Sequence, residues 1–501
     1  MKISTASLSD APRHRTLFIA LFQKTPLTEE EFLSSLPPET KKTIAEWAKK
    51  EFRGEEGEIK SFWLASGAPQ RIVLFGLGEK PKWNGRKEPL IARRMAQYAK
   101  RERIAEFATP LPPSALSDSA ERAKIFAANA LMAQFDYTKH KEKPPEGWPE
   151  IKSIALLADT KDIARVAEGI RMGIIIGEEV NACRNLANTP GSEMTPSMLA
   201  EEAGRVGRKN SIRVKILEER DMKRLGMGGI LGVAAGSQEK PKFIILEYLK
   251  GPRGQKPLAL IGKGVTFDTG GLNIKPDQYM YEMHMDMSGG GAVIHGVAAI
   301  SRLKLPVSVV GIIPAVENMP SGSSYRPGDM LKSMSGKTIE VLNTDAEGRI
   351  ILADGLWYGM KKYNPGLMVD FATLTGAAHV ALGNYCSALF TNREALELPL
   401  RAVGDASGDY VWPLPLWDEY FNDIKGIFGD VANTGTKADR YGGAIHGAKF
   451  LEQIVGDTAW AHLDIAPKMT TIDSEYLARG ASGVGVRYIV ELTRQYPNLT
   501  K

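Results

Sequence analysis

Apolar and polar residues are arranged along this chain in two ways, as short continuous apolar runs and as longer stretches with a helical period. The first pattern predicts buried strands and the second predicts amphipathic helices. In the first third of the chain the apolar runs predict strands at 15–22, 71–78 and 153–159. The helical period predicts helices at 29–36, 41–52, 90–103 and 119–135.

From about residue 190 onward, apolar runs recur with helical segments between them. They predict strands at 242–249, 258–267, 307–316, 338–343, 367–374 and 459–465. Several of these runs are apolar throughout, as expected of strands that are covered on both faces. The alternation of strands and helices predicts an α/β fold, in which each domain is a mixed sheet flanked by helices.

The length of 501 residues exceeds what one hydrophobic core normally supports, so we expect two domains. Residues 136–150 carry many charges and three prolines without any period, which predicts a surface loop or linker. Residues 161–188 form one long helical pattern that could bridge two domains. We therefore expect an N-terminal α/β domain at 1–160, a connecting helix at 161–190 and a larger C-terminal domain at 191–501.

Composition narrows the class of protein only a little. The net charge of +5 is a small excess for a chain with 64 basic and 59 acidic residues, and it does not argue for a nucleic-acid partner. Two cysteines cannot form a disulfide framework, which fits a reducing cytoplasm. The N-terminus lacks a signal-peptide pattern, and no apolar run approaches the ~20 residues of a membrane span. We expect a cytoplasmic protein without a membrane partner.

One local exception to the even charge is the basic stretch at 85–103, within the N-terminal domain. A solvated helix face is the interpretation that we favour for it. The alternative is a binding protein whose N-terminal domain contacts nucleic acid or a regulator through this stretch. Binding to DNA that weakens steeply with salt would distinguish the two.

Charged residues gather where several of the predicted strands end. Lys263 interrupts the apolar run at 258–267, Asp268 and Lys275 follow that run, and Asp286 stands just before a glycine-rich helix start. The segment after 338–343 adds a second group, Asp345, Glu347 and Arg349. In layered α/β folds, ligands bind at the carboxyl ends of the strands, so we expect these side chains to share one crevice.

Four carboxylates in one crevice would repel one another, and divalent cations are the partners that best neutralise them. Carboxylate ligands suit Mg, Mn or Zn, and a pair of ions ~3.5–4 Å apart is a recurrent hydrolytic device. In an extended segment, residues two apart point the same way, so Asp345 and Glu347 could face one metal pair. The alternatives without a metal are that Asp345 and Glu347 form a solvated acidic pair and that Asp286 only caps a helix. His284 could also serve in the site, but we favour a place for it in the wall of the site.

Other motifs are missing or incomplete. The segment 262–271 resembles a dinucleotide loop, but Phe267 stands where a third glycine is required. The chain has no H-E-x-x-H and no G-x-S-x-G motif. These absences disfavour the common zinc-protease and serine-hydrolase sites.

The segment NTDAEGR (343–349) resembles the signature of the leucyl aminopeptidases, which form the cytosol aminopeptidase or M17 family. GKGVTFDTGGLNIKP, MHMDMSGGGAV, DFATLTGA and WAHLDIA also follow in the order and spacing of that family. The resemblance extends from about residue 185 to the C-terminus and is weak over the first ~160 residues. It implies a metal-dependent exopeptidase with an α/β catalytic domain at 191–501.

The resemblance also implies roles for individual residues. The two-metal ligand positions of the family fall on Lys263, Asp268, Asp286, Asp345 and Glu347, with Asp268 and Glu347 bridging the ions. Lys275 and Arg349 match its catalytic residues. Met283 matches a position that lines the pocket for the first side chain of the substrate. The implied cofactors are two divalent ions, Mn²⁺ or Zn²⁺, with bicarbonate at Arg349 as a proton shuttle.

The implied reaction is hydrolysis of the N-terminal peptide bond of peptides and amino-acid amides by a water that the two metals activate. The family prefers leucine and other bulky apolar N-terminal residues and assembles as a homohexamer. This sequence departs from the family at Pro467 and Lys468, where glycine and a small residue are usual. That departure affects the expected shape of one pocket wall and hence the side-chain preference.

Overall fold

The computed structural model describes residues 1–25, 36–64, 69–436 and 441–499. The chain separates into two compact units, one formed by residues 1–181 with 472–478 and the other by 182–471 with 479–501. The boundary between them falls inside a single long helix, α4 (Ile163–Ala187). Each unit has its own sheet and its own hydrophobic core.

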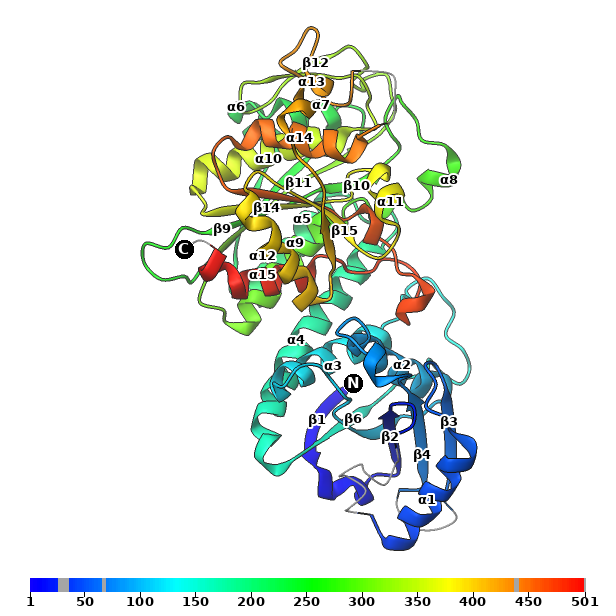
Figure 1. Ribbon diagram of the computed structural model, residues 1–501. Coiled ribbons are helices and arrows are strands. Elements are labelled where there is room, and N and C mark those ends of the chain that lie inside the picture. The colour runs from blue at the N-terminus through cyan, green and yellow to red at the C-terminus, as the bar shows by residue number, and fades with distance from the viewer. Residues whose placement is uncertain (26–35, 65–68, 437–440, 500–501) are drawn as a thin grey trace. The chain divides into compact units, whose positions relative to one another are not determined.

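The first unit is built on a six-stranded sheet with the order β1-β6-β5-β2-β4-β3 (Figure 1). All neighbours are parallel except β3 and β4, which are antiparallel. The strands are β1 (Lys2–Ser7), β2 (Thr16–Leu21), β3 (Ile59–Trp63), β4 (Arg71–Gly76), β5 (Glu106–Pro110) and β6 (Ser153–Ala158). The helices are α1 (Pro38–Glu51), α2 (Glu88–Arg101), α3 (Ser119–Gln134) and the first part of α4.

Helices cover both faces of this sheet because its inner strands β2, β4 and β6 are apolar and buried at nearly every position. In β2, Leu17 and Ile19 pack with α1 on one face, while Phe18 and Ala20 pack with α2 and α3 on the other. The predicted strands at 15–22, 71–78 and 153–159 are thus confirmed as β2, β4 and β6. The helix predicted at 29–36 lies outside the described residues, apart from Leu36.

The basic stretch at 85–103 overlaps α2, and its basic side chains divide between exposed and buried positions. Arg93, Arg94 and Lys100 are buried. Arg93 donates to Asn129 and Lys100 pairs with Asp136 at 2.8 and 2.7 Å. The solvated-face interpretation was therefore wrong for these three residues, because their side chains pack inward and donate to acceptors around the helix.

The second unit is built on a nine-stranded mixed sheet with the order β16-β15-β18-β14-β9-β11-β8-β7, and β10 pairs with β11 beyond the end of β9. Its centre, β18-β14-β9-β11, is parallel. The strands are β7 (Arg213–Leu217), β8 (Lys242–Leu249), β9 (Leu258–Gly262), β10 (Gly264–Asp268), β11 (Ser308–Asn318), β14 (Leu367–Ala372), β15 (Ser387–Thr391), β16 (Val411–Pro413) and β18 (Trp460–Asp464).

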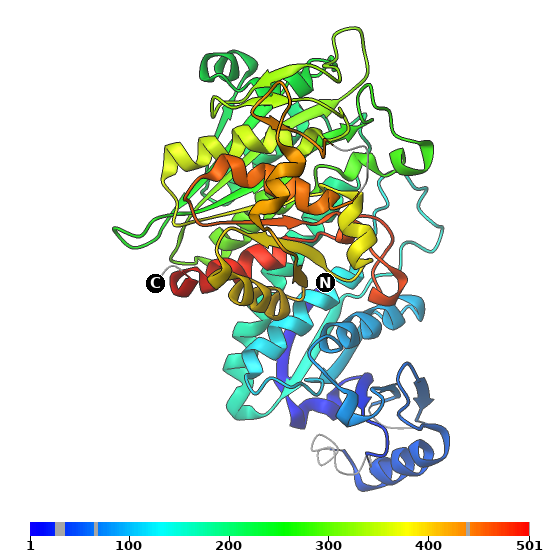
Figure 2. The ribbon, with the colours of Figure 1, turned by 45° about the horizontal axis from the view of Figure 1, so that its top comes forward.

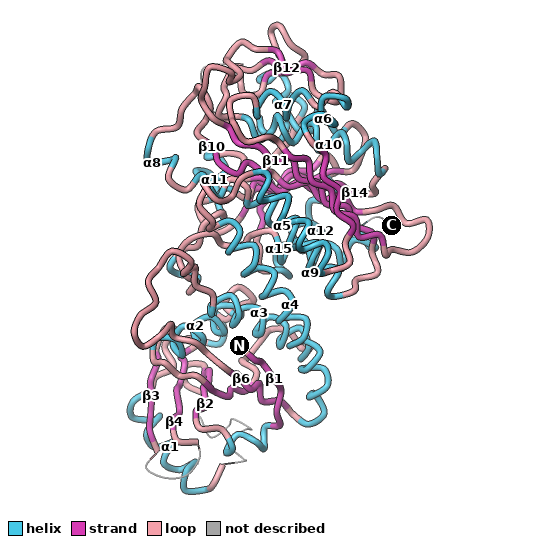
Figure 3. Tube along the Cα trace, turned by 180° about the vertical axis from the view of Figure 1, so that it is seen from behind, coloured by secondary structure: helices cyan, strands magenta, loops and turns pink. Residues whose placement is uncertain are grey.

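Helices lie on both faces of this sheet as well (Figures 2 and 3). On one face, α10 packs against β9, β11 and β14, with α7 and α14 beside it. On the other face, α9 packs with α15 and α5. The helices of this unit are α5 (Pro196–Lys209), α6 (Glu219–Leu225), α7 (Gly228–Ala234), α8 (Asp277–Met280), α9 (Ser288–Leu303), α10 (Glu347–Tyr363), α11 (Gly376–Leu382), α12 (Glu394–Ser407), α13 (Phe421–Ile424), α14 (Gly443–Val455) and α15 (Val486–Leu499). Among the described residues, no helix is both long enough and apolar enough to cross a membrane.

The strand predicted at 338–343 belongs elsewhere. Only Thr338–Glu340 form a strand, β13, which lies in a separate three-stranded sheet with β12 (Met330–Lys332) and β17 (Val431–Ala432). The segment that follows, with Asp345 and Glu347, therefore reaches the main sheet from a neighbouring sheet. The other predicted strands of this unit are present in the main sheet, and the run at 258–267 is divided into β9 and β10 at Lys263.

Candidate metal centre

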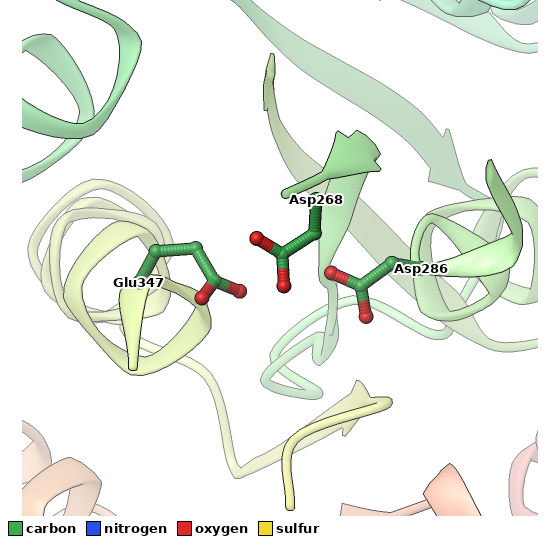
Figure 4. Close-up of side chains that lie close together, drawn as sticks. All are labelled: Asp268, Asp286 and Glu347. Atoms are coloured by element: carbon green, nitrogen blue, oxygen red, sulfur yellow. The ribbon is translucent and has the colours of Figure 1, made fainter. Parts of the chain in front are cut away.

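Three buried carboxylates meet at the carboxyl end of the central parallel strands (Figure 4). Asp268 is the last residue of β10, Asp286 follows the 3-10 turn Met283–Met285, and Glu347 is the first residue of α10. One oxygen from each lies within 4.8 Å of the other two. Asp286 does not cap α9, because the residue before that helix is Met287 and no side chain caps it.

Glycines allow the helix and the strands to approach closely at this point. The backbone N–H of Lys263 donates to the carbonyl of Phe371 at 3.0 Å, and its carbonyl accepts from the N–H of Gly290 at 2.7 Å. A Cβ on Gly289 would lie 2.0 Å from the carbonyl oxygen of Phe371. The glycine-rich start of α9 is therefore what seats this helix, and Asp286 before it, against the strand ends.

Lys263 lies at the break between β9 and β10 and points into the carboxylate cluster. Its Nζ lies 2.8 Å from both Asp286 and Glu347 and donates to the carbonyl of Thr373 at 2.9 Å. Burial lowers the pKa of Lys263, but the nearby carboxylates outweigh it and hold that pKa above its ordinary value. In the metal-free site this lysine is thus a cation that balances two of the acids.

Lys275 neutralises the other side of the cluster. Its Nζ lies 2.9 Å from Asp268 and forms a second ion pair with Asp345. The acids around it likewise hold the pKa of Lys275 above its ordinary value, against the effect of burial. Lys275 is therefore charged and joins the carboxylate of Asp345 to the buried group of three.

The expected geometry of Asp345 and Glu347 was wrong. Asp345 lies in a turn and Glu347 begins a helix, so the two do not share one face of an extended segment. Glu347 belongs to the group of three, whereas Asp345 contacts it through Lys275.

The electrostatics of the cluster suit a divalent cation. Burial raises the pKa values of Asp286 and Asp345, and neighbouring carboxylates add to the effect although the lysines oppose it. The Oε2 atom of Glu347 is buried and has no hydrogen-bond partner among the described residues. Because a buried carboxylate oxygen without a donor is costly, the donor set fits a hard or borderline metal ion.

Arg349 stands in the first turn of α10, buried beside the start of α14. Within the described part of the chain it forms no ion pair, and its Nε has no hydrogen-bond partner. Burial lowers the pKa of Arg349 to about 10, so the group is charged at neutral pH. It forms no ion pair with Asp345 or Glu347, and a planar guanidinium fork is of the kind that suits anion recognition.

The remaining predicted residues lie around this centre. Met283 opens the 3-10 turn that leads to Asp286 and is half-buried, as is His284, whose pKa burial lowers. Pro467 and Lys468 are buried in the 3-10 turn Ala466–Lys468, which packs against α11.

Sequence reasoning missed the polar residues that orient the ligands. Thr373 donates from its hydroxyl to Asp286 Oδ1 at 2.6 Å while its carbonyl binds Lys263. Asn318 donates from its amide to Asp268 Oδ1 at 2.8 Å. Both residues stand at or just after the end of a strand, and an uncharged polar residue at that position is the signal that could have found them.

The fold is a layered α/β architecture with a buried carboxylate and lysine cluster, a candidate metal site, at the strand ends. Residues 181–490 match the model of the cytosol aminopeptidase family, catalytic domain, and residues 18–144 match that of its N-terminal domain. The chain belongs to the cytosol aminopeptidase family. Its class of activity is that of a metallo-aminopeptidase, a hydrolase.

Several proteins are similar over nearly the whole chain. A probable cytosol aminopeptidase of Syntrophotalea carbinolica is 40% identical, covering 89% of this chain and 90% of the relative. One of Cenarchaeum symbiosum is 39% identical, covering 88% and 90%. Among solved structures, the bottromycin maturation enzyme BotP in complex with Mn has a TM-score of 0.82 at 26% identity, covering 97% of this chain and all of that one (100%).

Proposed function

We propose that this aminopeptidase works with two divalent ions, Mn²⁺ or Zn²⁺, held by the two sides of the cluster. One ion would take Lys263, Asp268, Asp286 and Glu347, and the other Asp268, Asp345 and Glu347. The observation that carries the proposal is the group of three buried carboxylates with a lysine against each side. The Mn in BotP, a structural relative, supports manganese as one candidate.

When bound, such ions polarise a carbonyl oxygen and lower the pKa of water. The chain's own residues supply the rest of the chemistry. Lys275 stays charged at the edge of the cluster, where it donates to the carbonyl oxygen of the scissile bond as negative charge develops there. Arg349 holds a small anion, bicarbonate, which relays a proton to the leaving amine.

The substrates we propose are peptides and amino-acid amides with leucine or another bulky apolar residue first. Met283 supplies an apolar wall for that side chain, next to the Asp286 ligand. The turn at Ala466–Lys468 replaces the small residues usual in the family by Pro467 and Lys468, and we propose that this narrows the range of accepted side chains. We propose residues 191–501 as the catalytic domain and residues 1–160 as the N-terminal domain, with residues 161–190, which contain α4, as the connection between them.

The test compares leucine amide with acetyl-leucine amide on protein stripped with a chelator and then reloaded with Mn²⁺ or Zn²⁺. Leucine amide is hydrolysed only by the reloaded protein, and acetyl-leucine amide is not hydrolysed, because an acetylated nitrogen cannot bind a metal. A panel of amides from glycine to phenylalanine then ranks the side-chain preference. Equal rates on the two leucine substrates, or full activity without metal, would overturn the proposal.

We also propose that the chain assembles as a homohexamer in the cytoplasm, on the resemblance to its family. Light scattering on the purified full chain measures the mass of the assembly directly. A monomer at micromolar concentration would contradict the assembly without touching the proposed reaction.

A further inference from the structure

Asn318 is the last residue of β11 and lies at the junction between the two parts of the metal centre. Its side chain is fully buried, and in the parallel ladder between β10 and β11 it stands opposite Asp268. Asp268 comes from the main sheet, whereas the segment with Asp345 comes from the three-stranded sheet. Asn318 contacts both.

The amide nitrogen of Asn318 uses both of its hydrogens for this purpose. It donates to Asp268 Oδ1 at 2.8 Å and to the carbonyl of Thr344 at 3.0 Å. The backbone carbonyl of Asn318 also accepts from the N–H and the hydroxyl of Thr269, at 3.1 and 2.7 Å. The chain just after Asp268 and the peptide just before Asp345 are thus fixed to one residue.

These bonds set the orientation of the Asp268 carboxylate. Oδ1 accepts from the Gly270 N–H, also at 2.8 Å, as well as from Asn318, while Oδ2 faces Lys275. With Oδ1 holding two donors, Oδ2 is the oxygen left to face the centre. A carboxylate that is hydrogen-bonded in this way cannot rotate without losing two donors.

We propose that Asn318 is a positioning residue for the reaction, which fixes the rotation of Asp268 and its distance from the Asp345 segment through one amide group. The inference rests on the proposed metal function of Asp268 and Asp345. Such outer partners are typically worth about 10–100-fold in metal affinity.

The chain offers matched controls that separate positioning from plain structural support. Asn433 is also fully buried and holds the same segment from the other side, donating to the carbonyl of Asn343 at 2.6 Å and accepting from the N–H of Leu342 at 2.8 Å. Tyr325 donates from its hydroxyl to the same Thr344 carbonyl at 2.6 Å. Neither donates to a carboxylate of the cluster.

The experiment titrates Mn²⁺ and Zn²⁺ into the metal-free full chain by calorimetry, for the wild type, Asn318→Leu, Asn433→Leu and Tyr325→Phe, and records thermal unfolding without metal for each. We expect Asn318→Leu to lose about 10–100-fold in metal affinity. The two control variants unfold at lower temperature but bind metal within about threefold of the wild type. Asn318→Ser, which is too short to reach both acceptors, repeats the test if the leucine variant does not fold.

Kinetics on leucine amide supply a second readout. Asn318→Ser lowers kcat more than it raises KM, because the metal geometry matters most in the transition state. Wild-type metal affinity in the Asn318 variants, or an equal loss in Asn433→Leu, would overturn the positioning role. Failure of the wild type itself to bind metal would instead overturn the proposed function, so the two failures are distinct.

Discussion

Replacing Gly348 by alanine is expected to damage the metal centre without removing any of its ligands. Gly348 is the second residue of α10, directly after Glu347. A methyl group there would lie 2.7 Å from Cε and 2.9 Å from both Cδ and Nζ of Lys263. Since carbon atoms in contact normally lie about 3.5–4.0 Å apart, the end of the Lys263 side chain must move by about 1 Å.

The displaced group is the flexible end of a side chain, so the fold survives and the change falls on the site. A shift of about 1 Å breaks the two ion pairs of 2.8 Å that Lys263 makes with Asp286 and Glu347. It also exceeds the ~0.2 Å that metal–ligand distances tolerate. We expect a loss of about 10–100-fold in affinity for the ion bound through Lys263, or about 1.4–2.8 kcal/mol.

Gly355 on the same helix provides the matched control. A methyl group there would lie 3.3 Å from Cγ2 of Ile261, which is tighter than ordinary contact, and 3.6 Å from Cδ of Pro314. Because neither neighbour belongs to the metal centre, Gly355→Ala should keep wild-type metal binding, and the tight contact opposes the gain of up to about 1 kcal/mol in helix propensity. Calorimetric titration with Mn²⁺, together with thermal unfolding, measures both variants. Unchanged metal affinity in Gly348→Ala would refute the assignment of Lys263 as a ligand.

Three further outcomes can be checked on the same protein. Lys275→Ala is expected to lower kcat by about 10²–10³-fold in steady-state assays. Arg349→Ala should retain more activity than Lys275→Ala but lose the stimulation by bicarbonate that we expect of the wild type. Loss of metal from Arg349→Ala without any bicarbonate effect would contradict the anion-holding role. Burial lowers the pKa of Lys263 but the carboxylates hold it above its ordinary value, so a metal that takes the amine displaces a proton. Metal affinity then rises with pH, about tenfold per pH unit for each proton released. Calorimetry in buffers of different ionisation heat counts the released protons, and a count of zero would contradict this expectation. Asp354→Ala leaves two buried donors, the N–H groups of Ile230 and Met334, without their acceptor; we expect a loss of several kcal/mol in thermal unfolding, at about 1–3 kcal/mol per group.

The sequence predicted the main strands well because a strand that is buried on both faces leaves a continuous apolar run. The segments around β8, β11 and β14 each carry such a run, and each is a strand. The candidate ligands at the strand ends were visible for the same reason, since charge follows directly on apolar sequence at Asp268. The division of the run at 258–267 was not predictable, because Lys263 interrupts it by a single residue.

Contacts between distant segments were the part that periodicity could not supply. Nothing in the sequence around 338–349 indicates that the strand at Thr338–Glu340 belongs to a second sheet, or that the following helix begins at Glu347. Asn318 and Thr373 each look like an ordinary polar residue at a strand end until the fold places a carboxylate beside them. The buried arginines of α2 were misread because a basic helix shows its charge in the sequence but not the acceptors that surround it.

The position of Lys263 also has a consequence for how the protein is made. Its amine binds the carbonyl of Thr373, 110 residues later in the chain. During translation, the site thus remains incomplete until that later segment has left the ribosome and paired beside β9. Long-range contacts of this kind form late, since loop closure must precede them. The arrangement in which Thr373 holds the amine of Lys263 therefore forms only after β14 has paired beside β9.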